Sequence, residues 1–281
     1  MNPKLQRLVF RYSILEKQLY SDLIELAEKD GHGNTIAILL NNPTRLNKEQ
    51  LLWACDFFEK HFADSTLLQL KNVLLNETEG IVLPKTIITF NADSLLYSLI
   101  VIFSVKQNFV KTKEYNFHFQ KYVQVIRPFE VGSVKIPICH LHGGIFPNPI
   151  KKTKNKNDSR DNLIFAETSY TKIAGSMHSW AQNSFLFHAT NTKMVFIGLS
   201  MSDPNIRRWL SWTAESLHAQ MEAYKGKQET ILRHVWVKTK PKDIETQKLL
   251  EPSLKHLSTK IGWLNDWSKL EGGLLNLIGG K

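Results

Sequence analysis

One pattern occurs three times in this 281-residue chain: an apolar, β-branched run is followed at once by a polar or glycine-rich turn. It occurs in Lys85–Leu96, Pro137–Gly144 and Met194–Asp203. Such runs are typical of buried strands, and in open α/β sheets ligands bind outside the carboxyl ends of the strands. The pattern therefore predicts three polar turns at one edge of a sheet, where together they would form a site.

The chain after residue 84 alternates between strand-like and helix-like segments. Strands are expected at Thr86–Phe90, Ile136–Leu141, Met194–Ile197, Arg233–Lys238 and Lys260–Trp263, with a further β-prone segment at Tyr115–Val125. Helices are expected at Ser94–Ser104, Thr168–Ala189, Asp203–Ala223, Ile244–Leu257 and Asp266–Ile278. This alternation predicts an α/β fold, with a Rossmann-like, mostly parallel sheet and helices on both faces.

The first eighty residues lack this alternation and are mainly helical. Apolar residues recur at helical spacing in Ser13–Lys29, Lys48–Phe62 and Thr66–Leu75. Gly31-His32-Gly33 follows a helix, whereas a dinucleotide-binding glycine motif must follow a strand, so it predicts a helix end. We expect a helical N-terminal part, residues 1–83, packed on a core of residues 84–281.

The chain is basic, with 36 Lys and Arg against 26 Asp and Glu and a net charge of +10. Part of the excess lies in Lys151–Arg160. A basic surface can attract a polyanion such as a nucleic acid. This segment has no interleaved aromatic side chains for base stacking, so a solvated loop is the better interpretation and nucleic-acid binding the weaker one.

Compartment and metal content also follow from the sequence. No apolar run reaches membrane-spanning length and no apolar signal core follows the N-terminal charges, so a cytoplasmic protein without membrane contact is expected. Cys55 and Cys139 lie in apolar contexts and are expected to be buried free thiols. Two cysteines cannot build a four-cysteine zinc site, and no zinc is expected.

Two side chains after the first predicted strand are candidates for chemistry. Asn91 offers an amide donor and acceptor, but Asn is also a common turn residue. Asp93 is well placed as the N-cap of the following helix. Taken alone, each residue fits a structural role better than a functional one.

The second turn contains Cys-His-Leu-His-Gly-Gly. Alternation along the strand predicts that His140 and His142 lie on the same side, with His142 at the strand end. An imidazole there could exchange a proton near neutral pH, and Gly143 would let a ligand approach the backbone closely. The alternatives are a core histidine before a glycine turn, or a zinc pair at i, i+2 with no evident third ligand.

The third turn, Gly198–Pro204, leads into a helix. Asp203 is a good N-cap, and Pro204 suits the first helical turn. A helix N-terminus with free backbone amides suits a phosphate or a ribose hydroxyl, and Gly198 and Ser200 could line a nucleotide there. The chain has no phosphate-loop motif, nucleophile elbow or acid pair at metal-binding spacing, which weakens nucleoside triphosphatase and serine hydrolase interpretations.

Four motifs, in their order and spacing, resemble those of SIR2-like (sirtuin-related) domains, most closely the bacterial SIR2-like proteins of antiphage defence. They are Thr89–Asp93, Leu141–Gly143, Ala166–Tyr170 and Phe196–Asp203, and the resemblance covers roughly residues 84–280. The family's opening glycine-rich strand and loop has no counterpart in Met1–Gly80. Without that loop, several charge-assisted hydrogen bonds to the diphosphate, each worth roughly 1.5–3 kcal/mol, would be missing.

The resemblance implies that NAD+ binds as substrate in a Rossmann-type crevice. By this resemblance, His142 is the catalytic base, Asn91 orders the nicotinamide ribose and the attacking water, and Asp93 supports the nicotinamide side of the pocket. The nucleotide-lining turn corresponds to Gly198, Ser200 and Asp203.

The implied activity is that of an NAD+ glycohydrolase, which cleaves the nicotinamide–ribose bond and depletes NAD+ during phage infection. A homo-oligomer or a complex with a defence-system partner protein is expected. The alternative is a catalytically impaired SIR2-like module that binds an ADP-ribose-like nucleotide or a partner and serves assembly. Protein deacetylation ranks lower, because protein sirtuins generally carry the four-cysteine zinc module.

Overall fold

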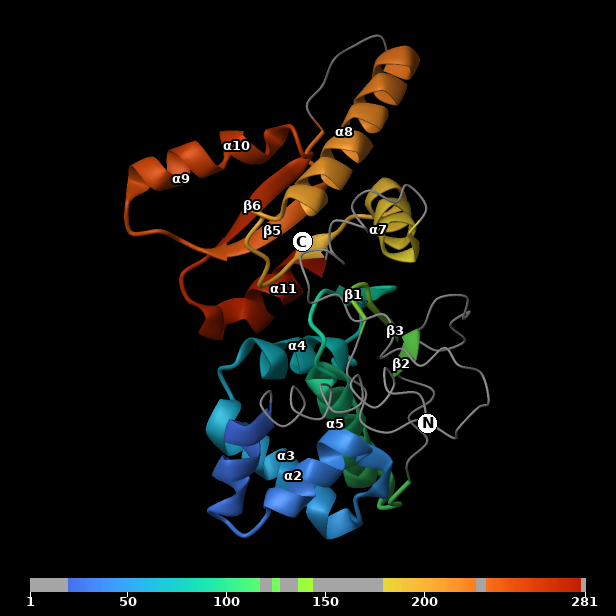
Figure 1. The fold of residues 1–281 in the computed structure, drawn as a ribbon, viewed down its shortest axis with the longest axis vertical. Coiled ribbons are helices and arrows are strands. Elements are labelled where there is room, and N and C mark those ends of the chain that lie inside the picture. The colour runs from blue at the N-terminus through green and yellow to red at the C-terminus, as the bar shows by residue number, and fades with distance from the viewer. Residues whose placement is uncertain (1–19, 117–122, 127–135, 144–178, 226–230, 279–281) are drawn as a thin grey trace, which may run out of the picture. The chain divides into compact units, whose positions relative to one another are not determined.

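The computed structural model describes residues 20–116, 123–126, 136–143, 179–225 and 231–278. The chain forms two compact units, Met1–Phe165 with Leu274–Lys281, and Ala166–Gly273 (Figure 1). Parallel strands flanked by helices occur in both units, so the expected α/β class is confirmed. The expected division into a helical part, residues 1–83, and a core, residues 84–281, stays a prediction.

Several expectations fall wholly or partly outside the described residues. They concern Ser13–Lys29, Tyr115–Val125, Lys151–Arg160, Ala166–Tyr170 and the first part of the helix expected at Thr168–Ala189. The described part of that last helix is α7 (Trp180–Asn191), which begins after its N-cap Ser179. Residues 20–28 of the helix expected at Ser13–Lys29 are helical.

The first unit opens with helices. They are α2 (Gly33–Asn41), the short 3-10 helix η1 (Pro43–Arg45), α3 (Lys48–Phe62), α4 (Thr66–Leu74) and the longer α5 (Leu95–Thr112). The side chain of Asn47 accepts from the backbone of Gln50, whose side chain accepts from Asn47, and this capping box fixes the start of α3. Helices α3 and α4 pack against α5, which also contacts strand β2 (Val123–Ile126).

Sheet A of the first unit has the strand order β1-β3-β2, with β1 at Ile87–Thr89 and β3 at Ile136–His140. Both strand pairs are parallel. Helix α5 is buried through its middle, from Ser98 to Val105, because that segment is almost wholly apolar. Its side chains join Ile136 and Ile138 of β3 in one hydrophobic core.

Sheet B of the second unit has the order β4-β5-β6, again parallel. Its strands are β4 (Val195–Phe196), β5 (His234–Thr239) and β6 (Thr259–Leu264). Helix α7 packs on α8 (Pro204–Lys225), and the ring of Phe185 lies 5.3 Å from that of Trp209 and 6.4 Å from that of Phe196. This aromatic cluster anchors the helices to the sheet.

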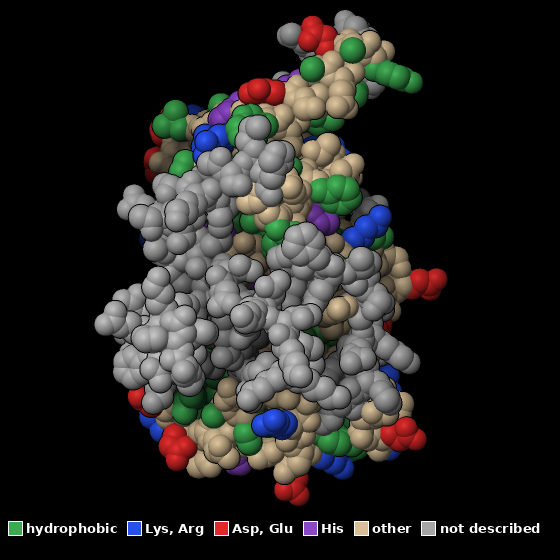
Figure 2. Space-filling view, turned by 45° about the vertical axis from the view of Figure 1, so that its right-hand side comes forward, with side chains coloured by type: hydrophobic (Ala, Val, Ile, Leu, Met, Phe, Trp, Pro, Cys, Tyr) green, Lys and Arg blue, Asp and Glu red, His purple; other side chains and the backbone are tan. Residues whose placement is uncertain are grey.

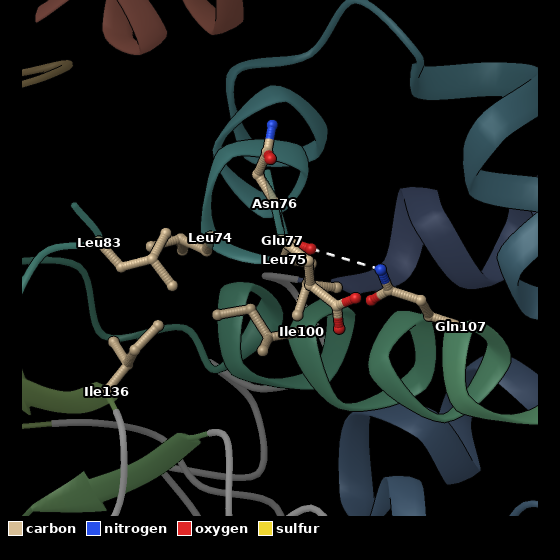
Figure 3. A pocket seen from close by; sticks show the side chains of 8 residues that line it. All are labelled: Leu74, Leu75, Asn76, Glu77, Leu83, Ile100, Gln107 and Ile136. Carbon is tan, nitrogen blue, oxygen red and sulfur yellow. Dashed lines mark hydrogen bonds between the residues drawn. The ribbon is translucent and has the colours of Figure 1, made fainter. Parts of the chain in front are cut away.

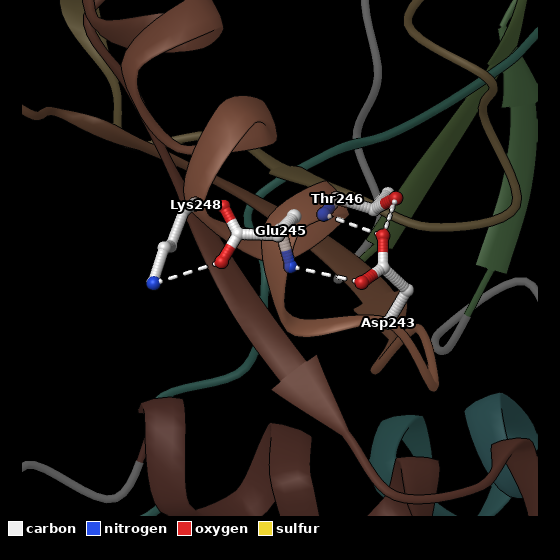
Figure 4. Close-up of polar contacts among 4 residues, drawn as sticks. All are labelled: Asp243, Glu245, Thr246 and Lys248. Atoms are coloured by element: carbon white, nitrogen blue, oxygen red, sulfur yellow. Dashed lines mark hydrogen bonds and ion pairs between the residues drawn. The ribbon is translucent and has the colours of Figure 1, made fainter.

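The helix expected at Ile244–Leu257 is two helices, α9 (Ile244–Leu250) and α10 (Pro252–Lys255). Pro252 lacks an N–H, so a new helix starts there more readily than the old one continues. The Asp243 carboxylate accepts hydrogen bonds from the backbone of Glu245 and Thr246 and so begins α9 (Figure 4). The chain then forms β6, a 3-10 turn η4 (Trp267–Lys269) and α11 (Leu270–Ile278).

The two cysteines are free and buried, as expected. Burial raises the pKa of the Cys55 thiol to about 12 and that of Cys139 to about 11, so neither is a nucleophile near neutral pH. Among the described residues, no helix has the length and apolar character needed to cross a membrane. Among the described residues on the face shown in Figure 2, Lys and Arg side chains are dispersed among acidic and apolar ones.

Candidate functional site

The turns that follow β1 and β3 begin at the same level of sheet A. Thr89 and His140 are register partners in adjacent parallel strands. The N–H of Leu141 donates to the Thr89 carbonyl at 3.0 Å, so the backbone pairing of β1 and β3 continues for one residue beyond the end of β3. Asn91 and His142 each lie two residues beyond the Thr89–His140 pair, so the fold brings both turns to one edge of sheet A.

Asn91 is held by its backbone and exposes its side chain. Its N–H donates to Oγ1 of Thr89 at 3.0 Å, and its carbonyl lies 2.9 Å from Nδ1 of His140. A carbonyl can only accept, so Nδ1 of His140 carries the proton. In the neutral imidazole the lone pair is then on Nε2. The backbone of the loop is thus fixed on both sides of an exposed amide.

His140 is itself only 7% exposed. Burial lowers the pKa of this imidazole, while the hydrogen bond to Asn91 and the negative charge of Asp93 oppose that shift. The neutral form therefore predominates near pH 7. Sequence reasoning placed His140 beside His142 but did not detect its contact with Asn91, because that contact depends on which strands pair.

His142 lies in a turn, where the alternation of a strand no longer applies. Strand β3 ends at His140, the Gly143 N–H donates to the His140 carbonyl at 3.1 Å, and Gly143 has a φ of +77°. A left-handed backbone of this kind favours glycine. The half-buried imidazole of His142 meets the ring of Phe90 edge to face, with 5.0 Å between the ring centroids.

Asp93 lies one residue before the N-cap of α5, which is Ser94, so the expectation that Asp93 is the N-cap is wrong; its side chain still bonds the start of the helix. Its Oδ1 accepts from the N–H of Leu95, the first residue of α5, at 3.1 Å. The preceding amide, that of Ser94, donates to the hydroxyl of Tyr20 at 3.2 Å. The start of α5 is therefore tied both locally and to the N-terminal helical region.

The turn after β4 is strained and firmly held. Gly198 has a φ of +68°, and the buried Met201 has a φ of +56°, which is costly for a residue with a side chain. Nη1 of Arg207 donates to the Met201 carbonyl at 3.2 Å, and Nε1 of Trp236 donates to the Leu199 carbonyl at 2.7 Å. Strained backbone of this kind is concentrated at functional sites in proteins.

Polar groups at the end of this turn largely bond one another. The hydroxyls of Ser200 and Ser202 are 2.6 Å apart. Oδ1 of Asp203 accepts from the N–H of Asn205 at 2.8 Å and from that of Ile206 at 3.2 Å, so Asp203 caps α8. The amides that sequence reasoning left free for a phosphate are therefore bonded to a carboxylate of the chain itself.

The expectation that all three polar turns lie at one edge of a single sheet is wrong, because β1 and β3 belong to sheet A whereas β4 belongs to sheet B. The candidate residues are accordingly divided between the two compact units. Asn91, Asp93, His142 and Gly143 belong to the first, and Gly198, Ser200 and Asp203 to the second. Within the described ranges, no group of three or more His, Cys, Asp or Glu side chains is arranged to hold a metal ion.

A pocket in the first unit lies away from these residues. It is lined by Leu74, Leu75, Asn76, Glu77, Leu83, Ile100, Gln107 and Ile136 (Figure 3). Most of these side chains are apolar, and Nε2 of Gln107 donates to the Leu75 carbonyl at 3.4 Å. The pocket contains none of the candidate residues.

Parallel strands with polar turns at their carboxyl ends define an α/β protein of the Rossmann-like class. A comparison with protein families matches residues 85–256, more than half of the chain, to the SIR2-like domain. The chain therefore belongs to the SIR2-like family. A comparison with curated proteins found no match.

Proposed function

We propose that the chain is an NAD+ glycohydrolase, with the carboxyl edge of sheet A as its reaction centre. The observation that supports this most directly is the register of β1 and β3, by which Asn91 and His142 each follow the Thr89–His140 pair by two residues. Membership of the SIR2-like family supports NAD+ as the ligand. The half-buried imidazole and the exposed amide supply a base and a positioning group.

The proposed reaction is hydrolysis at C1′ of the nicotinamide ribose. The C–N bond breaks and its electron pair leaves with neutral nicotinamide, so that positive charge develops on the ribose as an oxocarbenium-like state. The Asn91 amide orients a ribose hydroxyl and the attacking water. The His142 imidazole takes the proton from that water as the new C–O bond forms. The products are nicotinamide, ADP-ribose and one proton.

In each unit, one glycine would let a ligand approach the backbone closely. Gly143 follows His142 directly with a left-handed backbone. At Gly198, no atom of the described residues lies within 4 Å of a Cβ built there, so the backbone is accessible from that side. We assign Asp93 and Asp203 a supporting role, in which they hold the starts of α5 and α8, and Ser200 a place in the turn that lines the nucleotide.

The decisive test is release of nicotinamide from NAD+ by the purified protein. His142→Ala should lower the rate by about 10²–10⁴-fold, the usual contribution of a general base, and Asn91→Ala should also lower it. His61→Ala, at an exposed histidine near the end of α3, is the matched control and should leave the rate unchanged. Intact NAD+ after long incubation with folded wild-type protein would contradict the proposal.

We further propose that this activity depletes NAD+ during phage infection. Cells that produce the wild-type chain should lose NAD+ after infection, whereas cells that produce His142→Ala at the same level should not. An equal fall of NAD+ in both strains would mean that this activity does not cause the loss of NAD+ during infection.

One observation favours a second candidate, a SIR2-like module without catalytic activity. The capping amides of α8 are bonded to Asp203, and Met1–Gly80 has no glycine-rich loop to hold the diphosphate in their place. Isothermal titration with NAD+ and with ADP-ribose distinguishes the candidates. Absence of heat with both nucleotides, together with a stable oligomer or partner complex, would favour the module.

A further inference from the structure

His140 links the two residues of the proposed reaction centre, because it lies two positions before His142 and bonds the backbone of Asn91. We propose that His140 is a positioning residue. Its Nδ1–H holds the Asn91 carbonyl and thereby keeps the exposed Asn91 amide at a fixed place beside the His142 turn. The catalytic consequence rests on the proposed function, whereas the hydrogen bond and its effect on the loop do not.

The contact is placed where it can control the loop. His140 ends the central strand of sheet A, and Asn91 follows the adjacent strand β1. The loop is held at its first residues by Thr89 and His140, and at Ser94 by the hydroxyl of Tyr20. Only residues 92 and 93 lie between these anchors. Loss of the His140 bond would therefore leave Asn91, the residue that carries the amide, held only through its N–H to Thr89.

Sheet B contains the same arrangement in the other compact unit. There Nε1 of Trp236, on the central strand β5, donates to the Leu199 carbonyl in the loop that follows the adjacent strand β4. In both sheets, a ring N–H from the central strand holds a carbonyl of a candidate ligand-binding loop. We call this hydrogen bond, from a ring N–H of the central strand to a loop carbonyl, the tie. Its recurrence supports a role in shaping the loop.

The chemistry of the tie determines which substitutions can preserve it. Nδ1 is bonded to Cγ of histidine, and Nδ2 occupies the equivalent position in asparagine. Asn at 140 can therefore donate to the Asn91 carbonyl, whereas Leu fills the site without a donor. Gln places its amide at the position of Nε2 and does not reproduce the Nδ1 contact.

The experiment compares His140→Leu with His140→Asn, with His234→Leu as a matched control. His234 is also buried, at 2% exposure, but it bonds Met194 at the amino end of sheet B. All variants are first checked for folding by circular dichroism. His140→Leu should lower kcat by about 100-fold, the usual cost of a misplacement near 1 Å. In His140→Asn, kcat should be about tenfold higher than in His140→Leu, which is the rate factor expected from one restored hydrogen bond.

A second readout measures the tie without reference to activity. The amides of Asn91, Ser94 and Leu95 each donate to a side chain, and their hydrogen exchange reports opening of the loop. Exchange should be about tenfold faster in His140→Leu than in His140→Asn or wild type. Long-range proton–nitrogen NMR of the wild-type imidazole should show Nδ1 protonated and Nε2 unprotonated.

The outcomes separate the two proposals. Wild-type kcat in folded His140→Leu, or equal losses in His140→Leu and His140→Asn, would overturn the positioning role. If the wild-type protein releases no nicotinamide, the proposed function fails, and hydrogen exchange alone decides the tie. In that case faster exchange in His140→Leu than in His140→Asn supports it, and equal exchange overturns it. A fall in kcat as large in His234→Leu would show that the loss is not specific to the tie.

Discussion

Sheets A and B each hold the loop after an outer strand with a ring N–H from the central strand, but the two rings differ in acid–base chemistry. The indole of Trp236 donates and does not titrate. The imidazole of His140 donates through Nδ1 and keeps a second nitrogen that can bind a proton. Equivalent positions in two sheets can thus provide the same mechanical restraint, while only the one beside His142 can also change its charge.

The two buried histidines on central strands extend this comparison. His140 lies at the carboxyl end of β3, and its Nδ1 donates to a carbonyl. His234 lies at the amino end of β5, and its Nδ1 accepts from the N–H of Met194 at 3.2 Å. The hydrogen bonds therefore select opposite tautomers. Because ligands bind at the carboxyl ends of parallel strands, we assign a structural role to His234 and a positioning role to His140.

Acid should give the largest effect on stability, and it should act strongly on the second unit. Burial, assisted by the charge of Arg233, lowers the pKa of His234 from 6.5 to about 4. Between these values the unfolded chain binds more protons at this residue than the folded chain does. The contribution of His234 to the free energy of unfolding therefore falls as pH falls from 6.5 to about 4, and it is constant above this window. The full shift corresponds to roughly 3 kcal/mol.

Hydrogen exchange of the β5 amides at several pH values within this window measures that loss. His234→Leu should be less stable than wild type at neutral pH and should show a weaker pH dependence, because the titrating group has been removed. An unchanged pH dependence in His234→Leu would mean that another group controls acid unfolding. Burial also lowers the pKa of His140, so protonation of this imidazole as the pH falls should likewise destabilise the first unit.

Trp236→Phe should give a smaller loss that does not depend on pH. The substitution keeps an aromatic ring but removes the donor to Leu199, at a cost of about 1 kcal/mol. Trp263→Phe is a matched control, because Nε1 of Trp263 donates to the exposed carboxylate of Glu251, which water can solvate instead. Thermal unfolding of both variants tests this difference. Equal losses would show that the Leu199 contact has no special weight.

Lys248→Ala should give the smallest effect. Lys248 and Glu245 form an ion pair at 3.0 Å on α9, and their side chains are 65% and 69% exposed (Figure 4). Such pairs contribute about 0.5 kcal/mol or less and are screened by salt. A change in thermal stability within that range, diminishing at high salt, is expected. A larger loss would require a contact of α9 beyond this exposed pair.

Much of the local structure could be predicted from the sequence. The Asp203-Pro204 pair correctly predicted the cap and start of α8, and the positions of the central strands agree with their apolar runs to within about two residues. The turn at His142 was less predictable, because alternation applies only while a strand continues, and β3 ends at His140. The ties made by His140 and Trp236 could not be predicted, because the donors lie 49 and 37 residues from their acceptors along the chain.

The sequence by itself determined which segments become strands and helices, because periodicity, capping residues and glycine positions act over a few neighbouring residues. It also placed Asn91 and His142 directly after strands. Tertiary structure decided that β1 pairs with β3 in a register that brings both turns to one edge, and that His140 protonates at Nδ1. Pairing and tautomer depend on groups that meet only after the chain has folded, since burial and a distant carbonyl set their free energies.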